Sequence, residues 1–237
     1  MMLGARTAAW SGKALPYDAE VEWLQGDGAS YIDGFIDFSN VSAKTTLVSC
    51  TIEVVDQVLD KFEDADKEQK TIFGIYPRKS SQTGCIRVQC PVEDDKTFYV
   101  LPFSALARSA YLHSLNDGKK ITATIVKSNQ TLATGSLSNT HGENNTSSIT
   151  SFNNSYFTPE GYTPILFGIK YPDGEIVALS HAKINSFKCK NEFTSQEVDM
   201  IPVRKDGVGY MYDKISGQLF GNAAGKGAFV IGPDKTT

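Results

Sequence analysis

Acidic side chains are the residues of this 237-residue sequence whose types and spacing come nearest to a catalytic pattern. Hydrolysis of a glycosidic bond needs two carboxyl groups that face each other across the bond. On a β-strand such groups must occupy alternate positions, because only those side chains share a face. Three acidic groups were considered for this role: Glu20 with Glu22, the run Glu63–Glu68, and Glu93-Asp94-Asp95.

None of these groups has the arrangement that the reaction requires. Glu93-Asp94-Asp95 is followed by Lys96-Thr97-Phe98, so no second Glu follows on the same face. Glu63–Glu68 lacks the apolar alternation of a strand, and Glu20 with Glu22 lacks any further acid in phase. The sequence therefore predicts that the chain is not an enzyme.

Two other catalytic patterns are also missing from the sequence. A Gly-x-Ser-x-Gly nucleophile motif does not occur. The stretch Gly221–Gly227 is too short for a phosphate-binding loop, lacks Ser or Thr after Lys226, and does not open a helix. We therefore assign no catalytic residue from the sequence.

The four cysteines predict buried thiols. Cys50 is in phase with Val48 and Ile52, and Cys90 is in phase with Ile86 and Val88. Buried cysteine behaves as a small hydrophobic residue. The three histidines stand apart, and Cys-x-x-Cys does not occur, so the sequence indicates neither a structural zinc site nor a disulfide scaffold.

Charge and hydropathy exclude several classes of partner. The net charge is −4 and the pI is about 5.4, without the basic stripe of a nucleic-acid-binding protein. Residues 1–15 lack a continuous apolar core, and nowhere do about 18 apolar residues follow one another. We expect a soluble chain with no signal peptide, no membrane span and no nucleic-acid partner.

Strand patterns fill most of the chain. The clearest is Thr45–Val55, in which Val48, Cys50 and Ile52 alternate with polar residues, as in a sandwich strand with one wet face. About a dozen such segments follow one another with turn signals between them, and no βαβ alternation occurs. The other expected strands are Glu20–Gln25, Ser30–Asp33, Thr71–Tyr76, Gly84–Cys90, Thr97–Leu101, Lys120–Lys127, Thr131–Leu137, Pro164–Ile169, Ala182–Cys189, Met200–Val203, Val208–Asp213, Gln218–Phe220 and Ala228–Ile231.

The remaining segments set the domain organisation. Residues 1–17 predict an extended arm or linker, and residues 18–237 a single β-domain. Asp56–Lys70 fits either a short surface helix or a charged loop, and Ser104–Leu115 either a short helix or a loop. Ser138–Ser155 is rich in Asn, Ser and Thr and predicts an exposed loop.

Two segments at opposite ends of the chain resemble a known family. The first is Glu22–Gly34, which reads Glu-Trp-Leu-Gln-Gly-Asp-Gly-Ala-Ser-Tyr-Ile-Asp-Gly; the second runs from Ile201 through Gly209-Tyr210-Met211-Tyr212-Asp213 to Phe229. Both are similar to motifs of concanavalin A-like, laminin-G-like (LamG) sandwiches in phage and gut-bacterial proteins. The resemblance covers about Glu20 to Asp234, nearly the whole chain.

This resemblance implies an all-β fold, a concanavalin A-like jelly-roll β-sandwich of two antiparallel sheets. It also implies a non-catalytic module that binds glycan or acts in adhesion, in a phage particle or at a bacterial cell surface. One alternative is a purely structural component that contacts other protein chains, for which the N-terminal arm is a candidate. A third is a glycoside hydrolase with an unrecognised carboxylate pair.

Two sets of residues are candidates for binding. Some laminin-G-like domains hold calcium, for which Asp27, Asp33 and Asp173 are weak candidates, although aspartates in turns usually serve local hydrogen bonds. We therefore predict no cofactor, with calcium as the open alternative. For glycan, the strand pattern directs four polar and aromatic side chains away from the core, unless another part of the chain covers them: Tyr76, Arg87, Gln89 and Tyr99.

Overall fold

The computed structural model describes residues 15–41, 47–59, 71–77, 85–91, 96–102, 110–129, 132–150 and 157–236. Every regular element within these ranges is a β-strand. The predicted all-β jelly-roll sandwich of two antiparallel sheets is confirmed. In the described part of the chain there is no helix that could span a membrane.

The larger sheet holds eleven strands. Its main path runs in the order β10 (Asn144–Ile149), β9 (Leu132–Asn139), β8 (Lys120–Asn129), β3 (Val48–Val55), β14 (Lys183–Asn191), β15 (Gln196–Lys205), β16 (Val208–Asp213) and β17 (Leu219–Phe220). Beside this path, β1 (Ala19–Glu20) pairs with β15, and β2 (Leu24–Gln25) pairs with both β14 and β18 (Val230–Ile231). The two ends of the domain therefore meet at the same part of this sheet.

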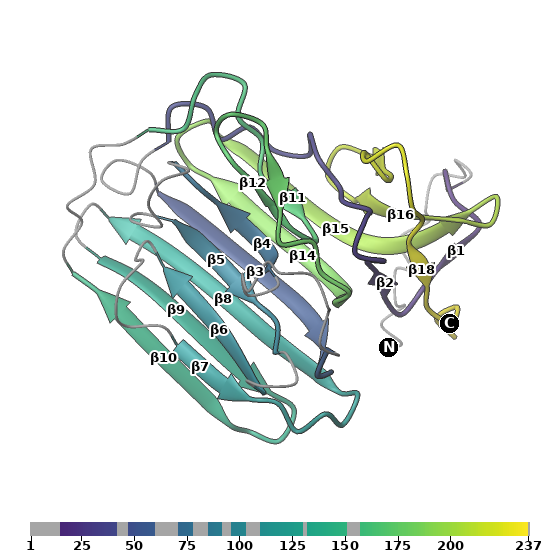
Figure 1. The fold of residues 1–237 in the computed structure, drawn as a ribbon, viewed down its shortest axis with the longest axis horizontal. Helices are drawn as coiled ribbons and strands as arrows, with labels where there is room; N and C mark the ends of the chain where they lie inside the picture. Colours follow the sequence, from purple (N-terminus) through teal and green to yellow (C-terminus); the bar gives the residue numbers. More distant parts are fainter. Residues whose placement is uncertain are drawn as a thin grey trace, which may run out of the picture.

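The smaller sheet has the order β11 (Ile165–Leu166), β4 (Thr71–Ile75), β5 (Ile86–Gln89), β6 (Thr97–Pro102) and β7 (Ala110–His113). A short ribbon of β12 (Ile169–Lys170) and β13 (Ile176–Val177) follows it. Figure 1 shows the smaller sheet lying over the half of the larger sheet that contains β8, β9 and β10. The half that carries β15 and β16 extends beyond it.

The core fills the space between the sheets because alternate side chains of each strand point inward. In β3 the inward set includes Val48, Ile52 and Val54, as the sequence predicts. The rings of Phe73 in β4 and Phe187 in β14 lie 4.9 Å apart between centroids and join the two sheets. Such aromatic pairs bury a large apolar area at the centre of a sandwich.

The closing hairpin is also as predicted. Lys205 and Val208 pair across a two-residue turn in which Asp206 has φ 50° and Gly207 has φ 76°. A type I′ turn requires positive φ at both positions, which Asp-Gly tolerates. The local sequence therefore sets the register of β15 on β16.

Four expected segments differ from the structure or fall, in whole or in part, outside the described residues. Ser138–Ser155 was expected to be a loop, but its residues 144–149 form the edge strand β10, held by its ladder to β9 although neither of its faces is buried. In Ser104–Leu115, residues 110–113 form β7 instead of the predicted helix or loop, with Ala110 and Leu112 facing inward, whereas residues 104–109 lie outside the described ranges. Of the Asp56–Lys70 segment, residues 60–70 lie outside the described ranges, as do residues 1–14 of the predicted arm.

The expectation of free thiols is wrong for one pair of cysteines. Cys50 of β3 lies directly opposite Cys189 of β14 in the strand register, and the two form a disulfide with Cα atoms 4.1 Å apart. Cys85 and Cys90 are buried thiols, as predicted. Strand pairing between distant segments, which the sequence does not reveal, brings the first pair together.

Candidate functional site

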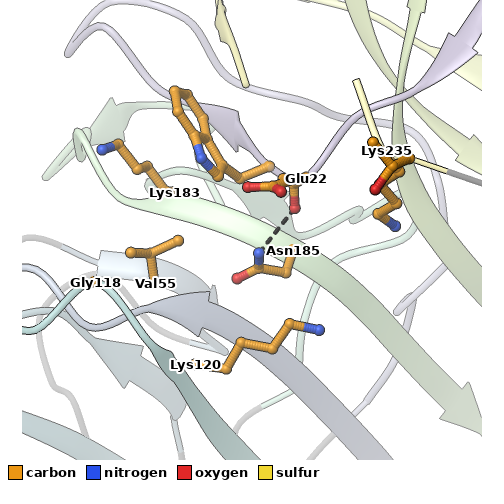
Figure 2. A pocket seen from close by; sticks show the side chains of 9 residues that line it. Glu22, Val55, Gly118, Lys120, Lys183, Asn185 and Lys235 are labelled. Carbon is orange, nitrogen blue, oxygen red and sulfur yellow. Dashed lines mark hydrogen bonds between the residues drawn. The ribbon is translucent and has the colours of Figure 1, made fainter. Parts of the chain in front are cut away.

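A pocket of about 570 Å³ opens on the outer face of the larger sheet, where β3, β8 and β14 end beside the C-terminal segment (Figure 2). It lies on the outer face because its strand residues alternate with the buried Val54, Ile121 and Ile184. Polar and charged side chains make up most of the wall. The lining residues are Glu22, Trp23, Val55, Gly118, Lys120, Lys183, Asn185, Lys235 and Thr236.

A break in the first predicted strand places Glu22 and Trp23 at this pocket. The sequence predicts one strand over Glu20–Gln25, but β1 pairs with β15 whereas β2 pairs with β14. Glu22 and Trp23, which lie between these strands, are held by the C-terminal segment, since Glu22 N donates to Pro233 O at 2.9 Å and Gly232 N donates to Trp23 O at 3.0 Å. Both ends of the domain thus fix the position of the indole.

Gly232 and Lys183 both lie close to the Trp23 ring. A Cβ atom at position 232 would lie 2.8 Å from Trp23 Cδ2, so only glycine lets the backbone approach the ring this closely. The Lys183 ammonium lies 4.6 Å from the ring centroid, a cation–π contact. The pocket therefore offers a large flat apolar surface beside a cation.

Asn185 enters the pocket through a β-bulge in β14. Ile184 pairs with Val54 and Ser186 with Glu53, so Asn185 is an extra residue with no partner in β3. Bulges of this kind redirect a side chain and are frequent beside functional sites.

Only one of the two polar atoms of the Asn185 side chain has a hydrogen-bond partner among the described residues. Its Nδ2 donates to Glu22 O at 2.8 Å, and the residue is 8% exposed. Its Oδ1 is buried and has no hydrogen-bond partner among the described residues. Figure 2 shows this oxygen turned away from Glu22, toward the side of the pocket where Val55 lies. A buried acceptor without a donor costs about 1–3 kcal/mol, which a bound donor would recover.

The charges around the pocket are unevenly paired. Lys120 Nζ lies 3.3 Å from Glu53, and Lys235 Nζ lies 3.7 Å from Glu20. Within the described ranges, Lys183 has no carboxylate within 4.0 Å, so its contact is the indole alone. Figure 2 shows Lys183, Asn185 and Lys120 around one side of the pocket and Lys235 beyond Glu22. Lys183 is therefore the pocket cation that remains available to an anion.

The ligand face expected on the smaller sheet is largely covered. Tyr76, Arg87 and Gln89 are 1%, 6% and 1% exposed, and only Tyr99 keeps partial exposure. The Tyr76 ring packs against Tyr171 of the loop after β12, with centroids 5.7 Å apart, and burial raises the Tyr76 pKa. The prediction of an open outer face here is therefore wrong for three of the four residues, because other parts of the chain pack on it.

The calcium candidates are used in separate local contacts. Asp27 accepts hydrogen bonds from Ala29 N at 2.9 Å, Ser30 N at 2.7 Å and Ala228 N at 2.8 Å. Burial alone would raise the Asp27 pKa, but the hydrogen bonds from Ser30, Ala29 and Ala228 outweigh it and lower the pKa to about 2. This carboxylate ties the loop after β2 to the C-terminal segment.

Asp33 and Asp173 each have their own hydrogen-bond partners, which differ from those of Asp27. Asp33 accepts from Lys170 Nζ at 2.7 Å and from the Thr163 hydroxyl, and Asp173 accepts from Glu175 N at 3.2 Å in an exposed turn. Over the described residues, no three His, Cys, Asp or Glu side chains gather as metal ligands. The structure thus does not bring the three candidates together.

A second pocket of about 570 Å³ lies between β15, β16 and β17. Its buried acid, Asp213, accepts hydrogen bonds from Asp199 N at 2.9 Å, Ser216 N at 3.0 Å and Ser216 Oγ at 2.6 Å. Its lining residue Gln196 accepts from Asp37 N at 2.7 Å. These groups already serve the turns around them, so the Trp23 pocket is the stronger candidate.

Sequence reasoning missed Trp23, Lys183 and Asn185 as site residues. One signal for Asn185 exists in the sequence. Ile184 and Phe187 are three residues apart yet both face the core, which a regular strand forbids and a one-residue bulge permits. The position of Lys183 over the indole depends on pairing between distant strands and has no such signal.

No family model matches the sequence, and no curated protein matches it. Three solved structures that match the chain are peptidases. Scytalido-glutamic peptidase with a transition-state analog inhibitor has 12% identity and a TM-score of 0.30, over 81% of this chain and 91% of its own. The same peptidase with a peptide-based analog has 10% identity and a TM-score of 0.30, over 92% and 100%. SCP-B of the Eqolisin family, in complex with a tripeptide, has 12% identity and a TM-score of 0.26, over 77% and 83%.

These matches correct one prediction. The sequence-based expectation that the chain is not an enzyme does not stand, because the matching structures are peptidases. At TM-scores of 0.30 and below, the likeness transfers neither a reaction nor a catalytic residue to this chain.

Proposed function

We propose that this chain is a glycan-binding domain and that the Trp23 pocket is its binding site. The observation that carries this proposal is that one pocket contains both an indole and the amide oxygen of Asn185, which has no hydrogen-bond partner among the described residues. Sugar rings stack their C–H faces on aromatic rings, while their hydroxyls bind amide, carboxylate and ammonium groups. Ligand sites commonly combine an apolar surface with a few placed polar groups in this way.

The chemistry of the wall supports this ligand class. Glu22 and Asn185 Oδ1 accept hydrogen bonds, and Lys183, Lys120 and Lys235 donate them. A sugar presents hydroxyls that both donate and accept, so it can use both kinds of group at once. An entirely apolar ligand would leave these groups unpaired, at a cost in affinity.

We further propose that the chain belongs with the concanavalin A-like, laminin-G-like domains of phage and gut-bacterial proteins, where it would serve adhesion. The motif Glu22–Gly34 supports this assignment, and its first two residues line the proposed site. In this motif Trp23 stands where the family often has Tyr, which keeps an aromatic ring at the position.

The proposal is tested by a glycan-array screen of the full chain, with and without calcium. We expect saturable binding that Trp23→Ala abolishes. The matched control is Tyr111→Ala, which removes an exposed ring (49% exposed) on β7 of the other sheet and should leave binding unchanged.

Three outcomes would contradict the assignment. Binding that survives Trp23→Ala but is lost in Tyr99→Ala would move the site to the smaller sheet. Calcium-dependent binding that survives both changes would move it to the aspartate-bearing loops. Absence of binding to every glycan would remove the proposed function itself.

A further inference from the structure

We infer that the Trp23 pocket selects a saccharide residue that bears a carboxylate, such as a uronic acid. This inference rests on the proposed function and adds the class of sugar. In the site that we infer, the sugar ring stacks on the indole, its carboxylate pairs with Lys183, and one of its hydroxyls donates to Asn185 Oδ1.

Lys183 differs from the other two lysines of the pocket in the partner of its ammonium group. The other two lysines of the pocket are neutralised, Lys120 by Glu53 at 3.3 Å and Lys235 by Glu20 at 3.7 Å. Lys183 has only the indole, 4.6 Å from its ammonium, among the residues that the structure describes. An ammonium without a counter-ion is a site for an anion, because a charge-assisted hydrogen bond is stronger than a neutral one.

Lys183 is the one lysine of the pocket without a carboxylate partner among the described residues. A single ammonium matches a carboxylate, which one cation neutralises with two oxygens in reach. The three oxygens of a sulfate ester need several donors, for which arginine is the usual residue. The described residues that line this pocket include no arginine.

Asn185 supplies an acceptor that a negatively charged group cannot use. Its Nδ2 is already bound to Glu22 O at 2.8 Å, and its Oδ1 has no donor within the described part of the chain. The ligand must therefore bring a hydroxyl to this oxygen as well as an anion to Lys183. A uronic acid carries both on one ring, whereas a simple anion carries no hydroxyl.

The overall charge does not account for this preference. The chain carries a net charge of −4, so its general field repels anions. Glu22 also lies at the pocket, so the carboxylate must be placed at Lys183 rather than elsewhere on the wall. Selectivity should therefore depend on Lys183 alone and not on surface lysines at large.

The test compares a panel of uronate-containing oligosaccharides with the same oligosaccharides after reduction of their carboxyl groups. Binding is measured by calorimetry with the full chain. We expect the uronates to bind at least about tenfold more tightly, since a hydrogen bond to a charged group contributes enough for this factor. Lys183→Gln should abolish the difference, and Lys183→Arg should retain it.

The matched control is Lys188→Gln, on the same strand and the same outward face, where Nζ pairs with Asp199 at 3.2 Å. This variant should bind as the unaltered chain does. Asn185→Leu, which keeps the size but removes the acceptor, should weaken uronate and reduced sugar alike. Thermal unfolding of each variant verifies that it is folded.

The outcomes separate this inference from the proposed function. Equal binding of uronates and their reduced forms, or loss of discrimination in Lys188→Gln, would overturn the inference and leave glycan binding intact. Tighter binding of sulfated oligosaccharides would likewise overturn it. No binding of any member of the panel, together with an empty glycan array, would remove both.

Discussion

The ammonium of Lys183 lies 4.6 Å from the centre of the Trp23 indole, on the outer face of the larger sheet. The two residues come from segments 160 positions apart in the sequence, and the pairing of β2 with β14 brings them together, with Lys183 opposite Gln25. The contact places the flat apolar ring of Trp23 beside Lys183. Lys183 is the one lysine of the pocket that has no carboxylate partner among the described residues. The contact can also be followed by tryptophan fluorescence, because the chain has two tryptophans and replacing Trp10 leaves Trp23 alone.

Removal of the Lys183 charge should change both the fluorescence and the stability of the protein. In a Trp10→Phe background, Lys183→Met should shift or intensify the Trp23 emission, because the ammonium no longer faces the ring. The free energy of unfolding should fall by about 0.5–1 kcal/mol, the typical contribution of an exposed cation–π contact. Lys188→Met is the control, and an identical change in both variants would contradict the contact.

Asp27 should make the protein sensitive to acid. Its pKa in the folded protein is about 2, below the ordinary value of 3.8, so its contribution to stability is present above pH 3.8 and is lost as the pH falls toward 2. Asp27→Ala should lower the free energy of unfolding at neutral pH by about 1–3 kcal/mol, because it leaves backbone N–H donors unsatisfied.

The measurement is urea unfolding of both proteins between pH 2 and pH 7. The difference between Asp27→Ala and the unaltered protein should narrow as the pH approaches 2. Glu160→Ala, a change at an exposed carboxylate, is the matched control. A difference that stays constant over this pH range would show that Asp27 stabilises by packing and not by its charge.

Reduction of the Cys50–Cys189 disulfide should destabilise the protein. The two cysteines are 139 residues apart, and a cross-link that closes a loop of this length restricts the unfolded chain strongly. The loss on reduction should be roughly 2–5 kcal/mol. Denaturant unfolding with and without reductant measures it, and the double variant Cys50→Ala/Cys189→Ala should show no effect of reductant. Four titratable thiols in the unfolded, unreduced protein would contradict the bridge.

Lys127 should give the protein a second pH dependence, at alkaline pH. This lysine lies on the inward side of β8 and is 1% exposed, and its burial lowers its pKa to about 8 from 10.5. Between these values the unfolded chain binds more protons than the folded one, so stability should rise with pH from 8 to 10.5. Lys127→Met should lack this rise.

The comparison is the slope of unfolding free energy against pH in the two proteins. Any excess in unfolding free energy of Lys127→Met over the unaltered protein should therefore shrink as the pH increases. Lys120→Met, at an outward lysine of the same strand, should keep the slope of the unaltered protein. Parallel slopes in Lys127→Met and the unaltered protein would show that Lys127 does not titrate in this range.

The sequence was informative where a property depends on neighbours along the chain. The alternation in Val48–Val55 predicts which side chains face the core, because successive side chains of a strand point to opposite faces. Asp206-Gly207 predicts the closing turn, because few residues adopt positive φ. The all-β class follows from many such short-range signals together.

Strand alternation and turn residues did not reveal that both faces of the smaller sheet are buried. The pattern around Arg87 and Gln89 correctly separates them from Ile86 and Val88, but it does not say what covers the outer face. Polar residues in a strand usually indicate solvent, whereas here other segments of the chain pack over them. The proposed ligand face therefore moved from the smaller sheet to the larger one.

By itself, then, the sequence determined most of the strands and turns and the inward side of the clearest strands, because these depend on backbone geometry over two to four residues, whereas β7, β10 and the break between β1 and β2 were not predicted. Only the tertiary structure decided that Cys50 meets Cys189 and that Trp23, Lys183 and Asn185 surround one pocket. Each of these meetings requires strands far apart in sequence to pair in one register, and at Asn185 the register shifts by one residue. A shift of one residue reverses the face of every side chain beyond it, so the site depended on a detail that periodicity alone does not specify.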